Sequence, residues 1–566
     1  MKQSSCRFTL ENGCLTLSNS VFFTRFEGIR KASADTVTPQ SRSLPYFEVT
    51  AHKEDGRLCH YQMWEDLPVV RMVEGAEAPM MTLTEQHWVI KSVKLKAFTD
   101  YADLLTVEQE TALFDLGLWT PLEGELFFFE DMESDRAFIL ISENPDWCTG
   151  TLSMPRKTGA LTLDSKGYPV VYGECRRGEC EALCRAYLRH ANHCPELVTM
   201  SNTWGDCNSA DRVCEAFIRK EIEAAKEMGV DIVQIDDGWQ SGNILFKNPR
   251  DERGNRTFDG PYWDMNRERF PNGVRPLTEE AAKDGIRVGM WFAPSSHHCF
   301  ALLERDKAAL RKAYEEEGAR FFKLDMYQAE SKEETDKMLE LLAEIYSFGP
   351  DVSVQMDVTR YSRLNYLCGR EYGTIFVENR YTKTANSFPH RVLRNLWNLS
   401  RYLPTNRFQF ELVNPDLNRE SYGEKDPFAP ALYEMDYLFA TVMLSNPLFW
   451  MEMQFLSEER RRQLAPIMKV WKEHRSVLSR ADVMPVGERP CGRSISGFYL
   501  SENGKPAYLL LFREVTDRDT ATISLPVDTA KAQVLISNAD VSVSVENGVA
   551  RATFSKPRSY AFVKLD

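Results

Sequence analysis

The spacing of apolar and polar positions changes twice along the chain and divides it into three zones. Up to about residue 195, short alternating runs such as CLTLSNSVFFTRF, MTLTEQHWVIKSVKLKAF and RAFILIS are separated by turns rich in Gly, Asn and Asp. An apolar residue at every second position predicts β-strands with one buried face. We therefore expect an N-terminal β-sandwich over residues 1–195, which ends with a linker helix at 179–190.

Residues 196–478 alternate short apolar strands with amphipathic helices. The segment EAFIRKEIEAAKEMG has helical spacing and ends at Gly229, a residue suited to a helix C-cap. Further helices are predicted at 279–284, 301–317, 332–346 and 390–403. The eight candidate strands are LVTMSNTW, VDIVQIDD, IRVGMWFAP, ARFFKLDM, DVSVQMDV, GTIFVEN, RFQFELVN and LFATVML. This repeat favours a (β/α)₈ TIM barrel. A doubly wound α/β sheet is the alternative, although no G-x-G-x-x-G or Walker loop follows any strand.

Residues 479–566 return to short strands. The runs are SISGFYLS, AYLLLFRE, ATISLP, AQVLISN, SVSVENG and SYAFVKL. They predict a small C-terminal antiparallel β-sandwich. The expected fold class is therefore α/β, with a TIM barrel between two β domains in the sequence.

The composition of the chain limits the kinds of molecule that it is expected to bind. The net charge is −14 and no basic run occurs, which argues against nucleic acid. The N-terminus lacks the apolar core of a signal peptide, and the longest apolar stretch, 437–449, is broken by Ser445, Asn446 and Pro447. The 13 cysteines have no paired spacing, which favours reduced thiols. We therefore expect a cytoplasmic protein with no membrane partner.

Candidate chemistry lies where two apolar strands end. The strand in GVDIVQIDDGWQ leads into Asp236, Asp237 and Trp239, and RFFKLDMYQ carries Lys323 and Asp325. A barrel presents its catalytic residues at the C-terminal ends of its strands. Carboxylates beside an aromatic plate, without a metal motif, indicate sugar chemistry on an oligosaccharide or glycoside. We expect neither a metal nor an organic cofactor. Zinc at the crowded cysteines and histidines of 175–194 is the alternative, but that segment lacks CxxC pairs.

With the strands laid out, the chain resembles glycoside hydrolase family 36, the α-galactosidases of clan D. The matching motifs occur in the family's order: NTWGD (202–206), IDDGWQ (235–240), KLDM (323–326) and LRNLWNLSRYLP (393–404). The resemblance covers nearly the whole chain and implies the same three-part architecture. It also implies a retaining, exo-acting α-glycosidase that hydrolyses a terminal α-linked sugar by double displacement. The choice between monomer and homo-oligomer does not follow from it.

The resemblance assigns the two catalytic carboxyl groups. Asp325 is the expected nucleophile, because it ends strand four, where the similar enzymes carry theirs. Lys323 points the same way by strand alternation and would keep Asp325 ionised. Glu378 in GTIFVENRYT is the expected acid/base, in place of the family's aspartate, and Asp357 in QMDV is its rival. Retention requires the two carboxyl groups to lie roughly 5–5.5 Å apart. The non-catalytic alternatives are a helix N-cap for Asp325 and an ion pair of Glu378 with Arg380.

Other residues are expected to bind the substrate. In the similar enzymes, aspartates equivalent to Asp236 and Asp237 accept hydrogen bonds from O4 and O6 of galactose. Trp239 and Trp204 offer flat faces to a sugar ring, although each has a buried core role as its alternative. The full expected set is Asp236, Asp237, Trp239, Trp204, Lys323, Trp291, Asp357, Arg363 and Arg380, with Asp206 a weaker candidate.

Two loops depart from the family pattern. Strand three normally ends W-F-x-P-E, but here it reads WFAPSSHH, with Ser295 at the glutamate position. Strand five normally leads into a glycine-rich S-G-G-G-R loop, but here MDVTRYSR follows. Both changes bear on sugar specificity more than on the hydrolytic mechanism. The residues 297–299 are expected in a solvated loop, with a metal site as the alternative.

Three further functions remain open. A transglycosidase would pass the covalent intermediate to a sugar instead of water. A catalytically silent carbohydrate-binding protein would use the altered loops to block chemistry. A metal-dependent isomerase or lyase would use Asp236, Asp237 and His297.

Overall fold

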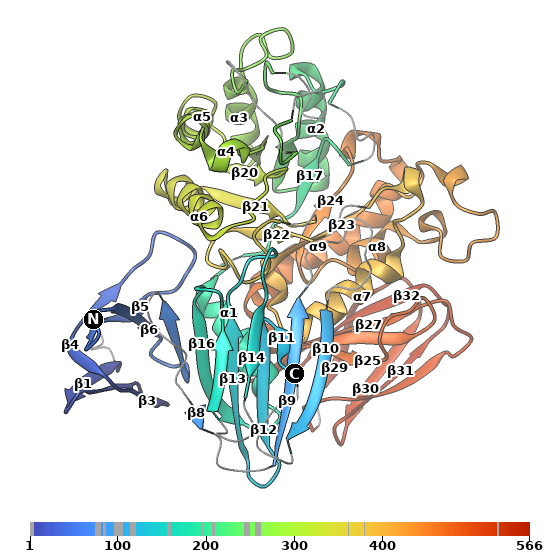
Figure 1. The fold of residues 1–566 in the computed structure, drawn as a ribbon. Helices are drawn as coiled ribbons and strands as arrows, with labels where there is room; N and C mark the ends of the chain where they lie inside the picture. The colour runs from blue at the N-terminus through green and yellow to red at the C-terminus, as the bar shows by residue number, and fades with distance from the viewer. Residues whose placement is uncertain are drawn as a thin grey trace. The chain divides into compact units, whose positions relative to one another are not determined.

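The computed structural model describes residues 5–73, 81–82, 87–95, 106–113, 120–154, 160–194, 196–205, 210–242, 250–254, 262–359, 362–377, 380–528 and 531–566. Figure 1 shows their helices and strands. They divide into two compact units. The first unit comprises Met1–Ala97, Leu104–His193 and Tyr361–Tyr372, and the second comprises Phe98–Asp103, Cys194–Arg360 and Gly373–Asp566.

The first unit is built from antiparallel sheets, as its alternating pattern predicts. A nine-stranded sheet has the order β10-β9-β12-β13-β16-β7-β6-β5-β4, a four-stranded sheet the order β11-β14-β15-β8, and a three-stranded sheet the order β1-β2-β3. The bounds are β1 Arg7–Glu11, β2 Cys14–Ser18, β3 Phe23–Phe26, β4 Ile29–Val37, β5 Tyr46–Lys53, β6 Leu58–Met63, β7 Val69–Val73, β8 Met81–Thr82, β9 Trp88–Leu95, β10 Thr106–Leu113, β11 Leu122–Gly124, β12 Leu126–Asp131, β13 Arg136–Ser142, β14 Gly150–Ser153, β15 Ala160–Asp164 and β16 Val170–Arg176. Helix α1 (Cys180–Ala191) follows at the predicted position.

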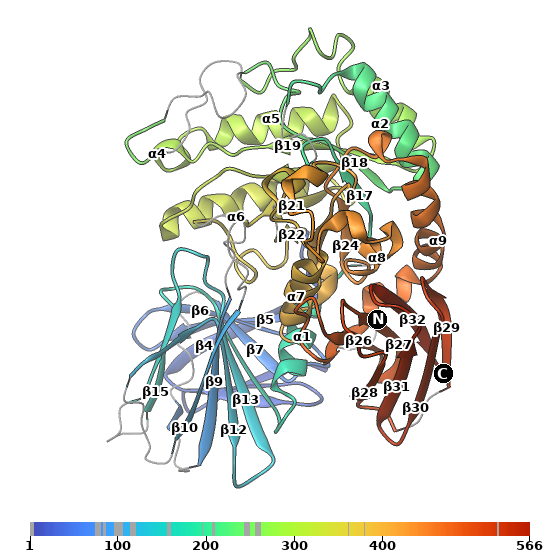
Figure 2. The same ribbon diagram turned by 90° about the vertical axis from the view of Figure 1, so that its right-hand side faces the viewer.

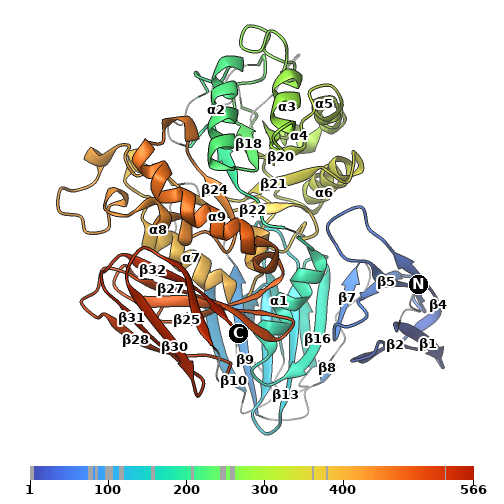
Figure 3. The ribbon, with the colours of Figure 1, turned by 180° about the vertical axis from the view of Figure 1, so that it is seen from behind.

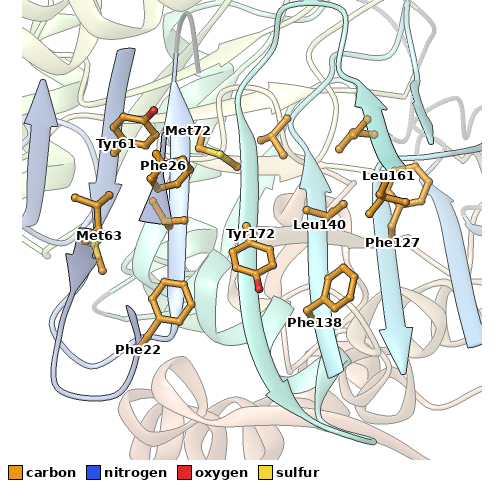
Figure 4. Close-up of a cluster of buried hydrophobic side chains, with 14 of the residues drawn as sticks. Phe22, Phe26, Tyr61, Met63, Met72, Phe127, Phe138, Leu140, Leu161 and Tyr172 are labelled. Carbon is orange, nitrogen blue, oxygen red and sulfur yellow. The ribbon is translucent and has the colours of Figure 1, made fainter. Parts of the chain in front are cut away.

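The inward side chains of these sheets form one apolar core (Figure 4). Phe26 lies against Tyr61 with ring centroids 4.4 Å apart, and Phe129 stacks on Phe138 at 4.2 Å. Buried aromatic pairs of this kind add stability beyond the area that they remove from water. The core therefore fixes the register that the sequence alternation implies.

A short segment between two barrel strands, residues 362–372, is packed into the first unit. The Arg370 guanidinium Nε lies 2.9 Å from Glu143 Oε1 and 2.8 Å from the Tyr187 hydroxyl. Arg71 holds the other oxygen, Glu143 Oε2, through Nε and Nη2, each at 2.9 Å. Asn192 donates to the Arg370 carbonyl at 2.8 Å. The Tyr187 hydroxyl also donates to Glu143 Oε1, so two arginines and a tyrosine share one buried carboxylate.

The second unit contains a closed barrel of eight parallel strands in sequence order, β17 to β24. This confirms the predicted TIM barrel and rules out the doubly wound sheet. The strands are β17 Met200–Asn202, β18 Ile232–Ile235, β19 Arg287–Phe292, β20 Phe321–Leu324, β21 Ser353–Asp357, β22 Thr374–Phe376, β23 Phe408–Leu412 and β24 Asn446–Phe449.

Helices lie on the outside of these strands, as Figure 2 shows for α3, α5 and α6. Their bounds are α2 Glu215–Met228, α3 Arg275–Ala282, α4 His297–Phe300, α5 Leu303–Glu315, α6 Lys332–Ser347, α7 Pro389–Ser400, α8 Met435–Ala440 and α9 Glu458–Arg480. Gly229 caps α2 in the left-handed conformation (φ 73°), as predicted. Among the helices in the described part of the chain, none combines the length and the apolar character that crossing a lipid bilayer requires.

The eighth strand was predicted at the wrong place. The run LFATVML lies in α8 and the turn after it, and the barrel is closed by β24, which begins at Asn446. The Asn446 side chain makes this possible inside the barrel. Its Nδ2 donates to the carbonyls of Asn406 and Phe408 at 2.9 and 3.0 Å, and its Oδ1 accepts from the Val198 amide at 3.0 Å. The apolar run before Asn446 was therefore mistaken for the strand that follows it.

The C-terminal part of the second unit consists of two antiparallel sheets, with the orders β25-β26-β27-β32-β29 and β28-β31-β30. The bounds are β25 Asp482–Gly487, β26 Ile495–Glu502, β27 Lys505–Arg513, β28 Thr520–Ser524, β29 Ala532–Ser537, β30 Val541–Glu546, β31 Val549–Phe554 and β32 Ser559–Leu565. Helices α7, α8 and α9 contact the five-stranded sheet (Figure 3). The predicted small antiparallel β domain is confirmed.

Candidate active site

Seven buried apolar side chains, each from a barrel strand or the residues just after one, pack together in the barrel interior. These side chains are Met200, Ile232, Phe321, Phe376, Val413, Leu448 and Trp450. Lys323 follows Phe321 by two residues and therefore faces the same interior. It pairs in register with Trp291 on β19 and Gln355 on β21. Parallel alternation thus brings charged and aromatic side chains together at the C-terminal ends of the strands.

Lys323 is the centre of this group. Its side chain is only 2% exposed, and its ammonium Nζ lies 3.0 Å from Asp236 Oδ2 and 3.8 Å from Asp325 Oδ2. Burial alone would lower the pKa of Lys323, but the charges of Asp236, Asp325 and Asp357 outweigh burial and raise it. Lys323 is therefore a cation that three carboxylates share. The Trp450 ring lies 4.8 Å from the same Nζ.

Asp325 follows directly on β20 and is the more open of the two carboxylates that contact Lys323. Its side chain is 15% exposed, against 4% for Asp236. Oδ1 accepts a hydrogen bond from the Met326 amide at 2.6 Å, and Oδ2 accepts one from Trp291 Nε1 at 3.2 Å. A carboxylate that is held at both oxygens, beside an ammonium, is suited to nucleophilic attack.

Asp236 and Asp237 follow β18 and are both buried. Asp236 Oδ2 accepts from Asn202 Nδ2 at 2.9 Å, and its Oδ1 accepts from the Asp237 amide at 2.9 Å. Asp237 Oδ1 accepts from Gln240 Nε2. These contacts fix both carboxylates, which are acceptors when ionised and therefore suit sugar hydroxyl donors.

Asp357 ends β21 and is held by the residue that departs from the family pattern. Thr359 donates to Asp357 Oδ1 through its amide at 3.0 Å and its hydroxyl at 2.8 Å. Two donors on one oxygen and the nearby Lys323 charge favour the carboxylate over the carboxylic acid. Asp357 is thus better suited to accept a hydrogen bond from a substrate than to donate a proton.

The two predicted tryptophan plates have different surroundings. Trp239 is 3% exposed; its Nε1 donates to the Trp291 carbonyl at 2.9 Å and its ring stacks on Trp263 at 5.8 Å. Trp204 is partly exposed and packs against the barrel-interior cluster. Of the two, Trp204 has the better access to a ligand.

Other predicted residues have contacts of their own or lie outside the described residues. Glu378 and Asp206 belong to the latter, and their roles stay predictions. Arg363 lies in the first unit, where its carbonyl accepts from the Asp146 amide at 3.1 Å. Arg380 is 1% exposed, and its amide donates to Glu411 Oε1 at 2.8 Å.

Sequence reasoning missed three site residues. Asn202 bonds Asp236, Trp450 lies against Lys323, and Glu411 on β23 holds the chain just after strand six. Asn202 was quoted in the NTWGD motif, so its position at a strand end was an available signal. Glycine is required at position 205 of that motif, because a Cβ there would lie 2.1 Å from the Trp450 carbonyl oxygen.

The strand-three loop contains the short segment α4, in which His297 and Cys299 are partly exposed and His298 is exposed. His298, Cys299 and Phe300 all have left-handed backbone angles, with φ of 46°, 55° and 54°. The Ser295 amide donates to buried Asp306 Oδ2 at 2.7 Å, and burial raises the pKa of Asp306 to about 6. Across the described residues, no group of three or more His, Cys, Asp or Glu side chains is arranged to hold a metal ion.

Several known proteins with similar sequences or folds are α-galactosidases. Residues 189–307 match the family described as Melibiase. Alpha-galactosidase 2 of Pediococcus pentosaceus is 31% identical over 98 residues, which are 17% of this chain and 12% of that protein. The predicted resemblance to the α-galactosidases of glycoside hydrolase family 36 is confirmed.

Solved structures of that family share the fold at low identity. A variant of the family 36 α-galactosidase of Geobacillus stearothermophilus, in complex with 1-deoxygalactonojirimycin, has a TM-score of 0.65 at 11% identity, covering 100% of this chain and 90% of that one. Other variants of that enzyme were solved with raffinose and with stachyose. The galactosidase domain of an α-galactosidase–sucrose kinase has a TM-score of 0.66 at 11% identity, covering 95% and 86%.

Proposed function

We propose that this protein is a retaining, exo-acting α-glycosidase of the α-galactosidase type. The observation that carries the proposal is Asp325, a partly open carboxylate at the end of β20, held by two donors and paired with the buried Lys323 ammonium. This is the arrangement that a glycosidase nucleophile needs. The match to Melibiase over 189–307 and the shared fold support the same activity.

In the proposed reaction, one Asp325 oxygen bonds to the anomeric carbon while the bond from that carbon to the leaving oxygen breaks. Glu378 gives its proton to the leaving oxygen. In the second step Glu378 takes a proton from water, the water oxygen attacks the anomeric carbon, and Asp325 leaves as a carboxylate. Asp236, Asp237 and Asp357 accept hydrogen bonds from the sugar hydroxyls.

Glu378 is preferred over Asp357 as the acid/base. The general acid must carry a proton at the start of the reaction, whereas the Thr359 donors and the Lys323 charge favour ionised Asp357. Retention then requires roughly 5–5.5 Å between the carboxyl groups of Asp325 and Glu378. A separation well beyond ~6.5 Å would favour inversion or another acid.

The deciding experiment follows p-nitrophenyl α-galactoside hydrolysis by proton NMR. Retention releases the α-anomer of galactose first, whereas inversion releases the β-anomer first. Related aryl α-glycosides, tested in parallel, define the sugar. Raffinose, with which a variant of the Geobacillus stearothermophilus enzyme was solved, tests an oligosaccharide substrate. Sugar binding by calorimetry without any hydrolysis would instead identify a silent carbohydrate-binding protein.

Lys323→Met tests the shared cation. Without the ammonium, Asp325 loses the positive charge 3.8 Å away that favours its ionised form. We expect the acid limb of the kcat/KM profile to move to higher pH by about 1–3 pH units, with a lower maximum. Lys312→Met is the control, because this lysine is 49% exposed and 3.6 Å from its partner Asp264. An unshifted acid limb in Lys323→Met would remove Lys323 from the proposed mechanism.

A further inference from the structure

The two oxygens of the Asp325 carboxylate are held by groups from different strands. Trp291, on β19, donates its indole N–H to Oδ2 at 3.2 Å, and the Met326 amide donates to Oδ1 at 2.6 Å. Met326 has φ 58°, a left-handed conformation that costs free energy in a residue with a long side chain. The backbone therefore adopts an unfavourable conformation where it contacts the carboxylate.

Trp291 is itself fixed by its surroundings. Its side chain is 1% exposed, and its carbonyl accepts the indole N–H of Trp239 at 2.9 Å. The Trp263 ring lies 6.0 Å away and stacks on Phe292, the next residue of β19, at 3.9 Å. A sugar platform needs an open face, which a side chain that is 1% exposed does not offer. The ring is enclosed, and its one polar atom points to Asp325.

We propose that Trp291 is a positioning residue, whose indole N–H sets the plane of the Asp325 carboxylate, and not a platform for the sugar. This inference rests on the proposed function. An attacking carboxylate gains rate from being held in one orientation, because a small misplacement of the reacting atoms costs up to about 10²-fold. Trp291 therefore contributes to the covalent step through Asp325.

Trp291→Phe keeps a buried aromatic ring and removes the N–H. We expect kcat on aryl α-galactosides to fall by about 10- to 100-fold. The dissociation constant of 1-deoxygalactonojirimycin should stay within about twofold of the wild type, since no sugar contact is lost. Weaker inhibitor binding in proportion to the lost activity would identify a sugar platform and overturn the proposal. Trp471→Phe is the control, because it removes another buried indole bond, to the Met443 carbonyl at 2.8 Å, away from the site.

A double variant separates action through Asp325 from action on the sugar. In Asp325→Gly, azide replaces the missing carboxylate, so there is no side chain left for Trp291 to position. Adding Trp291→Phe should then change the azide-supported rate by no more than about twofold. A second loss as large as that in the wild-type background would contradict positioning.

One measurement does not depend on activity, so failure of the proposed function leaves the inference testable. With ¹⁵N-labelled tryptophan, the Trp291 indole proton is identified as the resonance that Trp291→Phe lacks. Asp325→Asn should move this resonance upfield, because the indole then donates to a neutral amide oxygen instead of a carboxylate. An unchanged resonance would show that the Trp291–Asp325 hydrogen bond is absent, whether or not the protein hydrolyses a glycoside.

Discussion

Asp325→Gly is expected to lose at least ~10³-fold in kcat on aryl α-galactosides and to regain turnover when azide is added. The substitution removes the carboxylate that bonds to the anomeric carbon and leaves space on that face of the sugar. Azide can attack from the same space, and the product is then the β-galactosyl azide. Rates and products are measured by p-nitrophenol release and by NMR.

The configuration of the azide product is the sharper part of this test. Attack from the Asp325 side gives the β-azide, because the anomeric centre is inverted once. Asp540→Gly is the control, because Asp540 is an exposed aspartate between β29 and β30, and this variant should keep full activity and not respond to azide. Full activity in Asp325→Gly, or an α-azide product, would show that another side chain is the nucleophile.

The strands that bear the site were predictable because their patterns are local. VDIVQIDD and ARFFKLDM are buried apolar runs that end in carboxylates, and both became barrel strands with Asp236 and Asp325 at their ends. A lysine within an otherwise apolar strand signals a purpose or a partner, since burying a charge alone is costly. Lys323 has such partners in the structure.

The eighth strand was missed because its pattern is not local. Every residue of α8 except Asp436 is buried, so the helix shows almost no polar face, and its apolar run resembles a strand. β24 contains Asn446 and Pro447, which usually end strands. The chain remains extended there because β24 pairs with β17 and β23 and because the Asn446 side chain bonds to Asn406, Phe408 and Val198.

Contacts that depend on which strands are neighbours also could not be predicted from the sequence. Trp450 lies against Lys323 because β24 closes the barrel beside β17, and Glu411 binds the Arg380 amide from the neighbouring strand. The sequence also showed no sign that residues 362–372, which follow strand five, belong to the first unit. Arg370 in that segment forms an ion pair with Glu143, which lies more than two hundred residues earlier in the chain.

Glu143→Leu is expected to destabilise the first unit by about 3–5 kcal/mol, because it leaves Arg71 and Arg370 buried without their shared carboxylate. The Glu143 side chain is 3% exposed, so water cannot replace the lost contacts. Urea unfolding at neutral pH measures the change. Leu163→Ala, a substitution in the apolar core of the same unit, serves as a control that removes packing and no charge.

The contact of Glu143 with the same two arginines determines how the stability of the first unit depends on pH. Burial would raise the pKa of Glu143, but Arg370, Arg71 and the Tyr187 hydroxyl outweigh burial and lower it. A carboxyl whose pKa is lower in the folded state stabilises the protein above the unfolded-state pKa, which is about 4.3 for glutamate. That stability is lost as the pH falls through the folded-state value. The wild type should therefore be more stable than Glu143→Gln by about one kcal/mol or more. We expect this difference in unfolding free energy to be constant from pH 7 to pH 5 and to shrink below about pH 4. A difference that grows as the pH falls would mean that Glu143 is protonated in the folded protein, and that the two arginines are balanced by another group.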